Sequence, residues 1–225
     1  MSTPCSDIAL ADAAGPMKDM LDKLSGENGN SWLVAWNLFL GMQAHALIAK
    51  LKEISLKRWK TFAVGGSTKD ELLVKFAEAR LPSGATGIQA SDWARDIAGK
   101  PACDFPKETE DGVEFVMGSL GDLFGFKKNT KTKVFLDEAF LAKHGLELCK
   151  PSDAFYLRLA YLDQPLDEWV RVGMKPIAGS GGRPREFVLE HYSNGVWLFA
   201  DCTNPDSQWS PDSLWIFRRK KVTQS

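Results

Sequence analysis

Histidine and cysteine are the residue types in this chain with the most specific chemistry, and both are few. The 225-residue sequence holds three histidines and four cysteines. His144 and Cys149 lie five residues apart, and His191 and Cys202 lie eleven apart. Two imidazoles and two thiolates can bind zinc tetrahedrally, so these four residues form a candidate metal site. Their spacing is wider than the short knuckles of structural zinc sites, which argues against this prediction.

The same region supplies the residues for an alternative prediction, an enzyme. An enzyme of unrecognised type would use His144, His191, Asp201 and Cys202, because nucleophilic catalysis needs a nucleophile, a base and an orienting acid. No serine stands in a Gly-x-Ser-x-Gly elbow. Gly65-Gly66-Ser67-Thr68 lacks the Gly-Lys-Ser/Thr ending of a P-loop. The sequence therefore predicts no catalytic residue and no cofactor.

Basic and aromatic residues gather near the end of the chain and around one earlier turn. Aromatic rings on a sheet beside cationic side chains can stack the bases of single-stranded nucleic acid. The candidate residues for this role are Arg183, Arg185, Trp209, Trp215, Arg218, Arg219, Lys220 and Lys221. Buried aromatic residues beside a solubilising tail give the same pattern. Association with nucleic acid is therefore an alternative prediction.

The overall charge balance excludes binding driven by a global field. Lys and Arg number 28 and Asp and Glu number 29, so the net charge is −1 at pH 7. That balance gives no general attraction to nucleic acid or acidic lipid. Eight tryptophans supply contact surface while the titratable groups form no recognised constellation. The leading prediction is a non-enzymatic binding or interaction module, with a protein or single-stranded nucleic acid as partner and no membrane.

Residues 31–49 are nineteen residues without a charge, nearly the length of a membrane span. Asn37, Gln43 and His45 within this stretch are costly in hydrocarbon. Its apolar residues recur at helical spacing, which favours a buried helix. The sequence leaves open whether this segment is a core helix, a partner-binding helix or membrane-associated.

Hydrophobic periodicity changes along the chain and predicts an α+β fold. A helical hairpin is expected over residues 1–56 and an α+β domain over 57–225. The middle segment of this domain is mixed, with a helix opened by a Thr68–Glu71 capping box and another capped by Ser91. Alternation then predicts a C-terminal five-stranded antiparallel meander, with strands at 155–161, 168–174, 186–192, 196–200 and 214–217.

Two features of this meander bear on function. Asn194-Gly195 is typical of a type I′ hairpin turn, which needs positive φ at both central residues. The bulky side chains of Trp169, Phe187, Trp197 and Trp215 need cover, which we expect from the preceding helices. The sequence therefore predicts that the large rings of the last third pack within a sheet.

Cysteine usage and the N-terminus predict a reducing, cytoplasmic setting. Cys5, Cys103, Cys149 and Cys202 are spread over the chain and show no disulfide framework. The first residues lack a basic segment followed by an apolar core, so we expect no signal peptide.

Ordered motifs over three quarters of the chain carry a family resemblance. They are Ser91-Asp92-Trp93, Asp96-Ile97, Gly99-Lys100-Pro101, Gly145-Leu146-Glu147-Leu148-Cys149, Leu157-Arg158-Leu159, Asp163-Gln164-Pro165, Glu168-Trp169, Met174, Pro176-Ile177, Asn204-Pro205-Asp206 and Trp215-Ile216-Phe217-Arg218-Arg219. Residues 59–220 thereby resemble a family of small, uncharacterised bacterial proteins from environmental genomes that has no known activity. The resemblance implies one continuous α+β unit and no catalytic residue.

Overall fold

The computed structural model describes residues 58–221, all of which belong to one compact unit, Leu56–Ser225. In this part of the chain no helix is long and apolar enough to cross a membrane. The helical hairpin predicted over 1–56, the domain boundary after it and the uncharged stretch 31–49 lie outside the described residues.

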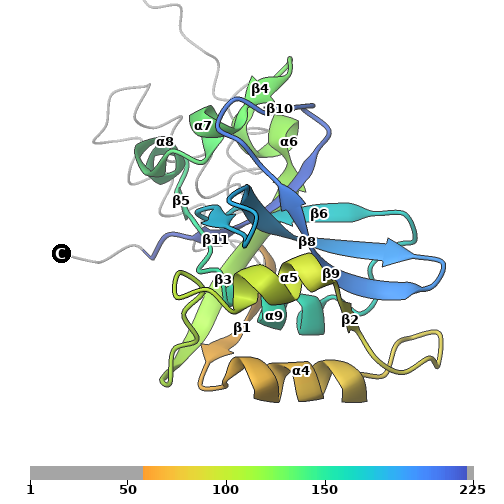
Figure 1. The fold of residues 1–225 in the computed structure, drawn as a ribbon. Helices are drawn as coiled ribbons and strands as arrows, with labels where there is room; N and C mark the ends of the chain where they lie inside the picture. Colours follow the sequence, from red (N-terminus) through yellow and green to blue (C-terminus); the bar gives the residue numbers. More distant parts are fainter. Residues whose placement is uncertain (1–57, 222–225) are drawn as a thin grey trace, which may run out of the picture. The chain divides into compact units, whose positions relative to one another are not determined.

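Strands dominate the described part of the chain (Figure 1). The strands are β1 (Arg58–Gly65), β2 (Gln89–Ala90), β3 (Thr109–Ser119), β4 (Thr130–Lys131), β5 (Leu146–Glu147), β6 (Trp169–Val172), β7 (Ile177–Ala178), β8 (Pro184–Tyr192), β9 (Gly195–Cys202), β10 (Gln208–Trp209) and β11 (Leu214–Arg219). The helices are α4 (Lys69–Glu78), α5 (Asp92–Ala98), α6 (Leu120–Phe124), α7 (Thr132–Phe135), α8 (Glu138–Lys143) and α9 (Asp153–Ala160).

The strands form a large curled mixed sheet and a small two-stranded ribbon. The nine-stranded sheet has the order β1-β3-β11-β6-β8-β9-β2, with β5 paired to β11 and β7 paired to β8. Two pairings, β11 with β6 and β2 with β9, are parallel. The ribbon consists of β10 and β4. The predicted fold class, built on a five-stranded antiparallel meander, is therefore wrong.

The meander prediction fails first at residues 155–161, most of which belong to helix α9. The alternating sequence there also fits a helix, because the buried residues Ala154, Leu157 and Arg158 lie three and four residues apart. The Asp153 carboxylate accepts a hydrogen bond from the backbone N–H of Lys150 at 2.7 Å and fixes the start of the helix. A run of seven residues supports either period, and tertiary packing selects the helix.

The prediction fails again at β11, which lies between β3 and β6 and does not continue from β9. Its register pairs Ile216 with Met117 of β3 and with Val172 of β6. These partners lie far away in sequence, and local alternation carries no information about them.

Several locally encoded elements are confirmed. The Thr68 hydroxyl accepts from the Glu71 N–H and the Glu71 carboxylate accepts from the Thr68 N–H, which completes the predicted capping box of α4. The Ser91 hydroxyl caps α5 at the Ala94 N–H, 3.1 Å away. Strands β8 and β9 form the predicted hairpin, but Gly195 alone has positive φ at its turn, so the turn is not type I′.

Helices cover different parts of the two faces of the sheet. Helices α4, α5 and α9 lie on the side where Phe187, Leu198 and Ile216 are buried in one apolar cluster (Figure 1). Helices α6, α7 and α8 lie by β3 and β11, where Trp215 and Phe217 belong to a second cluster. Successive side chains of β11 therefore point to opposite faces of the sheet and pack in the two different clusters, as strand geometry requires.

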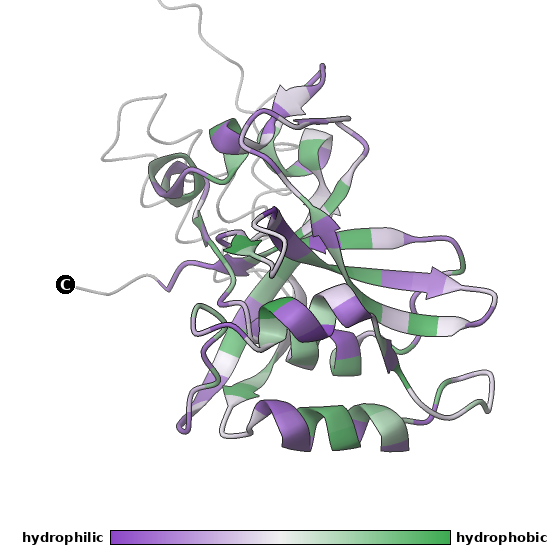
Figure 2. Ribbon diagram, viewed as in Figure 1, coloured by the Kyte–Doolittle hydropathy of each residue, from purple (hydrophilic) through white to green (hydrophobic). Residues whose placement is uncertain are grey.

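Helix α4 shows how local pattern and packing agree. Hydrophilic residues lie at its two ends and hydrophobic residues near its centre (Figure 2). Leu72 and Phe76, four residues apart, are its buried side chains. The ring of Phe76 stacks on Phe155 of α9, 5.5 Å between centroids.

Candidate functional site

Three neighbouring strands align two tryptophans and a glutamate across one face of the sheet. The register pairs Trp169 of β6 with Glu190 of β8, and Glu190 with Trp197 of β9. The row continues onto β2, where Gln89 pairs with Trp197. Directly opposite residues have Cβ atoms about 5 Å apart. Glu190 therefore lies between Trp169 and Trp197 in this row.

A second group of charged residues lies further along the same face. Arg171 of β6 shares the face with Glu186 of β8 and Asp201 of β9, which are paired in register. We call the whole set the acidic–aromatic face, and its residues are Trp169, Arg171, Glu186, Glu190, Trp197 and Asp201.

Arg171 bridges two carboxylates. Its Nη1 lies 2.8 Å from Glu186 Oε1 and its Nη2 lies 2.7 Å from Asp201 Oδ2. The guanidinium also lies 4.0 Å from the ring centroid of Trp209. Stacking and charge pairing together fix this side chain, so Arg171 is not free to neutralise other acids on the face.

Glu186 is fully buried and only half paired. Its Oε1 accepts from Arg171, while its Oε2 has no hydrogen-bond partner in the described part of the chain. Burial outweighs the attraction of Arg171 and raises the pKa of Glu186 to about 7. This carboxyl group can therefore exchange a proton near neutral pH.

Glu190 also has a buried carboxylate oxygen without a hydrogen-bond partner, and no arginine that the structure describes pairs with this carboxyl group. The residue is 4% exposed, and its Oε2 has no hydrogen-bond partner among residues 58–221. Burial raises its pKa. Burial, together with the Glu190 carboxylate, also raises the pKa of Tyr192 to about 12. By contrast, the neighbouring Trp169 is 52% exposed.

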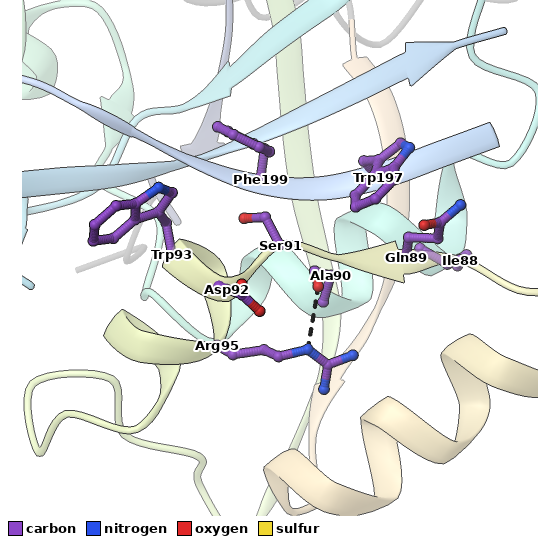
Figure 3. A pocket seen from close by; sticks show the side chains of 9 residues that line it. All are labelled: Ile88, Gln89, Ala90, Ser91, Asp92, Trp93, Arg95, Trp197 and Phe199. Atoms are coloured by element: carbon purple, nitrogen blue, oxygen red, sulfur yellow. Dashed lines mark hydrogen bonds between the residues drawn. The ribbon is translucent and has the colours of Figure 1, made fainter. Parts of the chain in front are cut away.

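The face continues into a groove at the edge of the sheet, where β2 and the start of α5 run beside β9 (Figure 3). Trp93, Trp197 and Phe199 contribute its aromatic walls. The Arg95 Nε donates to the Ala90 carbonyl oxygen at 3.1 Å, so this cationic side chain is held against the backbone that lines the groove. Gln89, Ser91 and Asp92 add polar atoms to the lining.

Arg185 covers part of the edge of β9 that the short strand β2 leaves unpaired. Its Nη1 donates to the Ala200 carbonyl of β9 at 3.1 Å, and its guanidinium lies 3.8 Å from the ring centroid of Trp93. Covering an edge carbonyl in this way discourages pairing with another chain. The predicted nucleic-acid residue Arg185 therefore has a structural role.

The remaining predicted nucleic-acid residues do not form one surface. Trp215 is fully buried, and Arg218 is buried in an ion pair with Asp153. The Trp209 Nε1 donates to Thr132 Oγ1 at 2.7 Å.

The basic residues of this set divide between two places. Arg219 pairs with Glu114 at 3.2 Å, and Lys221 pairs with Glu110 at 3.2 Å. Lys220 is exposed, while Arg183 is exposed in the loop before β8. The structure does not bring the two groups into a common stripe of aromatic and basic side chains.

The predicted metal and catalytic residues are also dispersed. His191 and Cys202 occupy opposite ends of the β8–β9 hairpin, since Cys202 pairs with Arg185 six residues before His191, about 20 Å along the strand. His144 ends helix α8 and Cys149 is buried near β11. Residues 58–221 contain no group of three or more His, Cys, Asp or Glu that could hold a metal ion.

Both histidines in residues 58–221 have a structural partner. The His144 Nδ1 lies 2.9 Å from the Phe140 carbonyl, and its ring packs edge-on against Phe124. The His191 Nδ1 lies at hydrogen-bond distance from the Gln164 carbonyl. Asp201 instead belongs to the ion-pair cluster with Arg171.

Sequence reasoning missed one serine with a charged environment. The Ser180 hydroxyl donates to Asp96 and accepts from Lys100 Nζ at 2.7 Å. Hydrogen bonds from Ser180 lower the pKa of Asp96 to about 2, so this carboxylate is a poor base. The three residues anchor the glycine-rich loop before β8 to helix α5.

Comparisons with known proteins add no relative to this geometry. The chain matches no family model, no curated protein and no solved structure. The resemblance to a bacterial family stays a prediction, and the function is inferred from the site itself.

The acidic–aromatic face was not predicted from the sequence, although part of its signal was present. Alternation along β8 places Glu186, Glu190 and Tyr192 on one face. The missing information was the cross-strand register, which places Trp169 and Trp197 on either side of Glu190. The expectation that all large rings are covered does not hold for Trp169.

Proposed function

We propose that this protein is a non-enzymatic binding module that takes its ligand on the acidic–aromatic face. The row Trp169–Glu190–Trp197 carries the proposal: an exposed indole lies beside a buried carboxyl group that has an unpaired oxygen. Tryptophan dominates binding hot spots because it buries a large rigid area with few rotamers. A polar group at the centre gives such a surface specificity.

The charges on the face favour a ligand other than nucleic acid. Its one cationic side chain is that of Arg171, which faces the carboxyl groups of Glu186, Glu190 and Asp201. Binding to a nucleic-acid backbone needs cationic side chains that neutralise phosphates, and Arg171 is already bound to two carboxylates. The engagement of Arg171 favours the binding module over the nucleic-acid alternative.

The environment of the reactive groups supports binding over catalysis. The catalytic candidates His144, His191 and Cys202 lie apart, and both histidines contact backbone carbonyls. Ser180 is held by a carboxylate and an ammonium group. A nucleophile needs an adjacent base that can take its proton, and these contacts do not supply one.

The proposed setting is the cytoplasm. Cys103, Cys149 and Cys202 are free thiols, two of them buried. Free cysteines persist where the surroundings are reducing.

Nuclear magnetic resonance tests the binding role. The ¹⁵N-labelled protein is titrated with a mixture of small aromatic, sugar and amine fragments, and we expect the indole N–H signals of Trp169 and Trp197 to shift together. Trp169→Ala removes the response, whereas Val74→Ala, an exposed apolar residue on α4, keeps it. Shifts confined to other parts of the protein, or no shifts at millimolar fragment, would show that this face is not a binding site.

A further inference from the structure

Glu190 presents a buried oxygen that lacks a partner. The residue is 4% exposed, and the described residues offer no hydrogen bond to its Oε2. Buried carboxylates are ordinarily paired, because an isolated buried charge is strongly disfavoured. A free protein can keep such a group protonated, and a cationic ligand would supply the missing partner.

The chain's nearby cations are engaged elsewhere. Arg171 is bound to Glu186 and Asp201, and the row of Val188 separates it from Glu190. Arg158 donates to the backbone carbonyl of Glu190, not to its carboxylate, and its Nη1 also donates to Gln164. The Glu190 carboxyl group interacts with the Tyr192 hydroxyl and is attracted by Arg171 at longer range, but no cationic side chain among residues 58–221 donates a hydrogen bond to its Oε2.

Aromatic residues are the neighbours of Glu190 on this face of the sheet. Trp169 and Trp197 are the two cross-strand neighbours of Glu190, and Tyr192 lies two residues along on the same face. The rings of Trp169 and Tyr192 contact each other edge to face, 6.1 Å between centroids. The indole N–H of Trp197 donates to the side-chain oxygen of Asn194 at 3.1 Å, which orients that ring.

The residue opposite Tyr192 on the neighbouring strand β9 is a glycine. Gly195 pairs with Tyr192, and a side chain there would meet one atom within 4 Å, the Nε2 of Gln89 at 3.5 Å. The glycine leaves room over the sheet beside the tyrosine ring. A cation above Glu190 can therefore reach ring faces on more than one side.

We propose that Glu190 together with Trp169, Tyr192 and Trp197 binds an organic cation, an alkylammonium or guanidinium group. The carboxylate supplies the opposite charge, and the rings attract the cation through their negative faces within about 6 Å of each centroid. This inference rests on the proposed binding function and assigns its ligand chemistry.

A metal ion fits this site poorly. Calcium and magnesium take several oxygen ligands, and the next carboxylate on β8, Glu186, lies four residues away, about 13 Å along the strand. Aromatic walls also favour weakly hydrated organic cations over strongly hydrated metal ions. The geometry therefore points to a single charged group with an apolar surround.

Calorimetric titration with choline chloride tests the inference, with 3,3-dimethyl-1-butanol as a neutral probe of the same shape. We expect choline to bind and the neutral alcohol to bind at least about tenfold more weakly, because the cation–aromatic and charge terms are lost. Equal binding of the two probes, or no binding of choline, would overturn the cation site.

Variants separate the carboxylate from the rings. Glu190→Gln keeps the side-chain shape and should weaken choline binding about tenfold, and Trp169→Ala should weaken it severalfold. Val74→Ala removes an exposed apolar side chain on α4, outside this face and its groove, and should leave choline affinity unchanged. An unchanged affinity in Glu190→Gln, with a melting temperature like that of the parent, contradicts the assignment of Glu190.

The source of the cation is distinguished by a second probe. N-acetyl-trimethyllysine amide carries the trimethylammonium group of choline on a peptide-like side chain. If it binds more tightly than choline, the cation site is supported and a peptide is identified as the source of the cation. If the two probes bind equally, the site is supported with a small molecule as the source. If fragments shift the Trp169 and Trp197 signals while both cations fail to bind, the cation inference is wrong and the binding function stands. If neither fragments nor cations bind, both are wrong.

Discussion

Arg218 and Asp153 form a buried, two-point ion pair that joins strand β11 to helix α9. Arg218 Nε lies 2.6 Å from Asp153 Oδ2, and Nη2 lies 2.7 Å from Oδ1. The side chains are 4% and 1% exposed. A parallel fork of this kind combines charge with geometric specificity. It also explains why a residue of the basic C-terminal run is unable to contact nucleic acid.

Breaking this pair should be costly. Asp153→Ala leaves a buried guanidinium with only Glu110 at 2.9 Å, and we expect the free energy of unfolding to fall by about 3–5 kcal/mol. Urea denaturation measures the change. The joint variant Asp153→Leu/Arg218→Met should recover much of the loss, because both charges are then removed. The exposed Asp206→Ala variant, which loses contacts to two lysines, should unfold like the parent.

The ionisation of Glu186 should make stability depend on pH. Its pKa is raised from 4.5 to about 7, so the folded state holds a proton that the unfolded state releases. This contribution is present below the unfolded pKa and is lost as the pH rises through about 7. We expect the free energy of unfolding to fall by up to about 3 kcal/mol between about pH 5 and pH 8.

Glu186→Gln isolates this contribution. The raised pKa of Glu190 acts in the same direction, so the parent is compared with the variant at each pH. Urea curves at several pH values should show a flatter profile for Glu186→Gln. Parallel profiles for the two proteins would mean that Glu186 does not titrate in this range.

Sequence signals predicted the parts of the fold that side chains encode locally. The Thr68–Glu71 box and the Ser91 cap each bond the backbone of their own helix, so spacing alone identifies them. The β8–β9 hairpin follows from alternation around a short turn. Elements with ambiguous periods, such as α9, and strands with distant partners, such as β11, were beyond local reasoning.

The candidate site shows the same division. The residue types of β8 are visible in the sequence, but their meaning depends on which rings lie opposite them. Strand β6 reaches β8 through residues 173–183, and its other neighbour β11 is over forty residues further along the chain. The pairing of Trp169 with Glu190 is therefore a product of the whole sheet. The spacing of histidine and cysteine was a poor guide, because His144 and His191 contact backbone carbonyls and Cys149 is buried.

Cysteine reactivity should differ sharply within the folded protein. Burial raises the pKa of Cys103 to about 12 and that of Cys149 well above its ordinary value, whereas Cys202 is half-buried. Thiolate is the reactive form, so iodoacetamide should modify Cys202 at least about tenfold faster than the other two. Mass spectrometry of peptides measures each rate. In urea, where the protein is unfolded, the three cysteines should react at similar rates, and this serves as the reference. Similar rates in the native protein as well would contradict the burial of Cys103 and Cys149.

Gly173, directly after β6, should not tolerate a side chain. Its N–H donates to the Ile216 carbonyl at 2.8 Å, and a Cβ there would overlap the ring of Phe217. That ring is fully buried between neighbours, so either the ring or the β6–β11 pairing must shift. We expect Gly173→Ala to lower the free energy of unfolding by about 1–3 kcal/mol in urea. Gly181→Ala is the matched control, because a Cβ there meets no atom within 4 Å, and its stability should equal or exceed that of the parent. Equal stability of both variants would show that the ring and strand yield without cost.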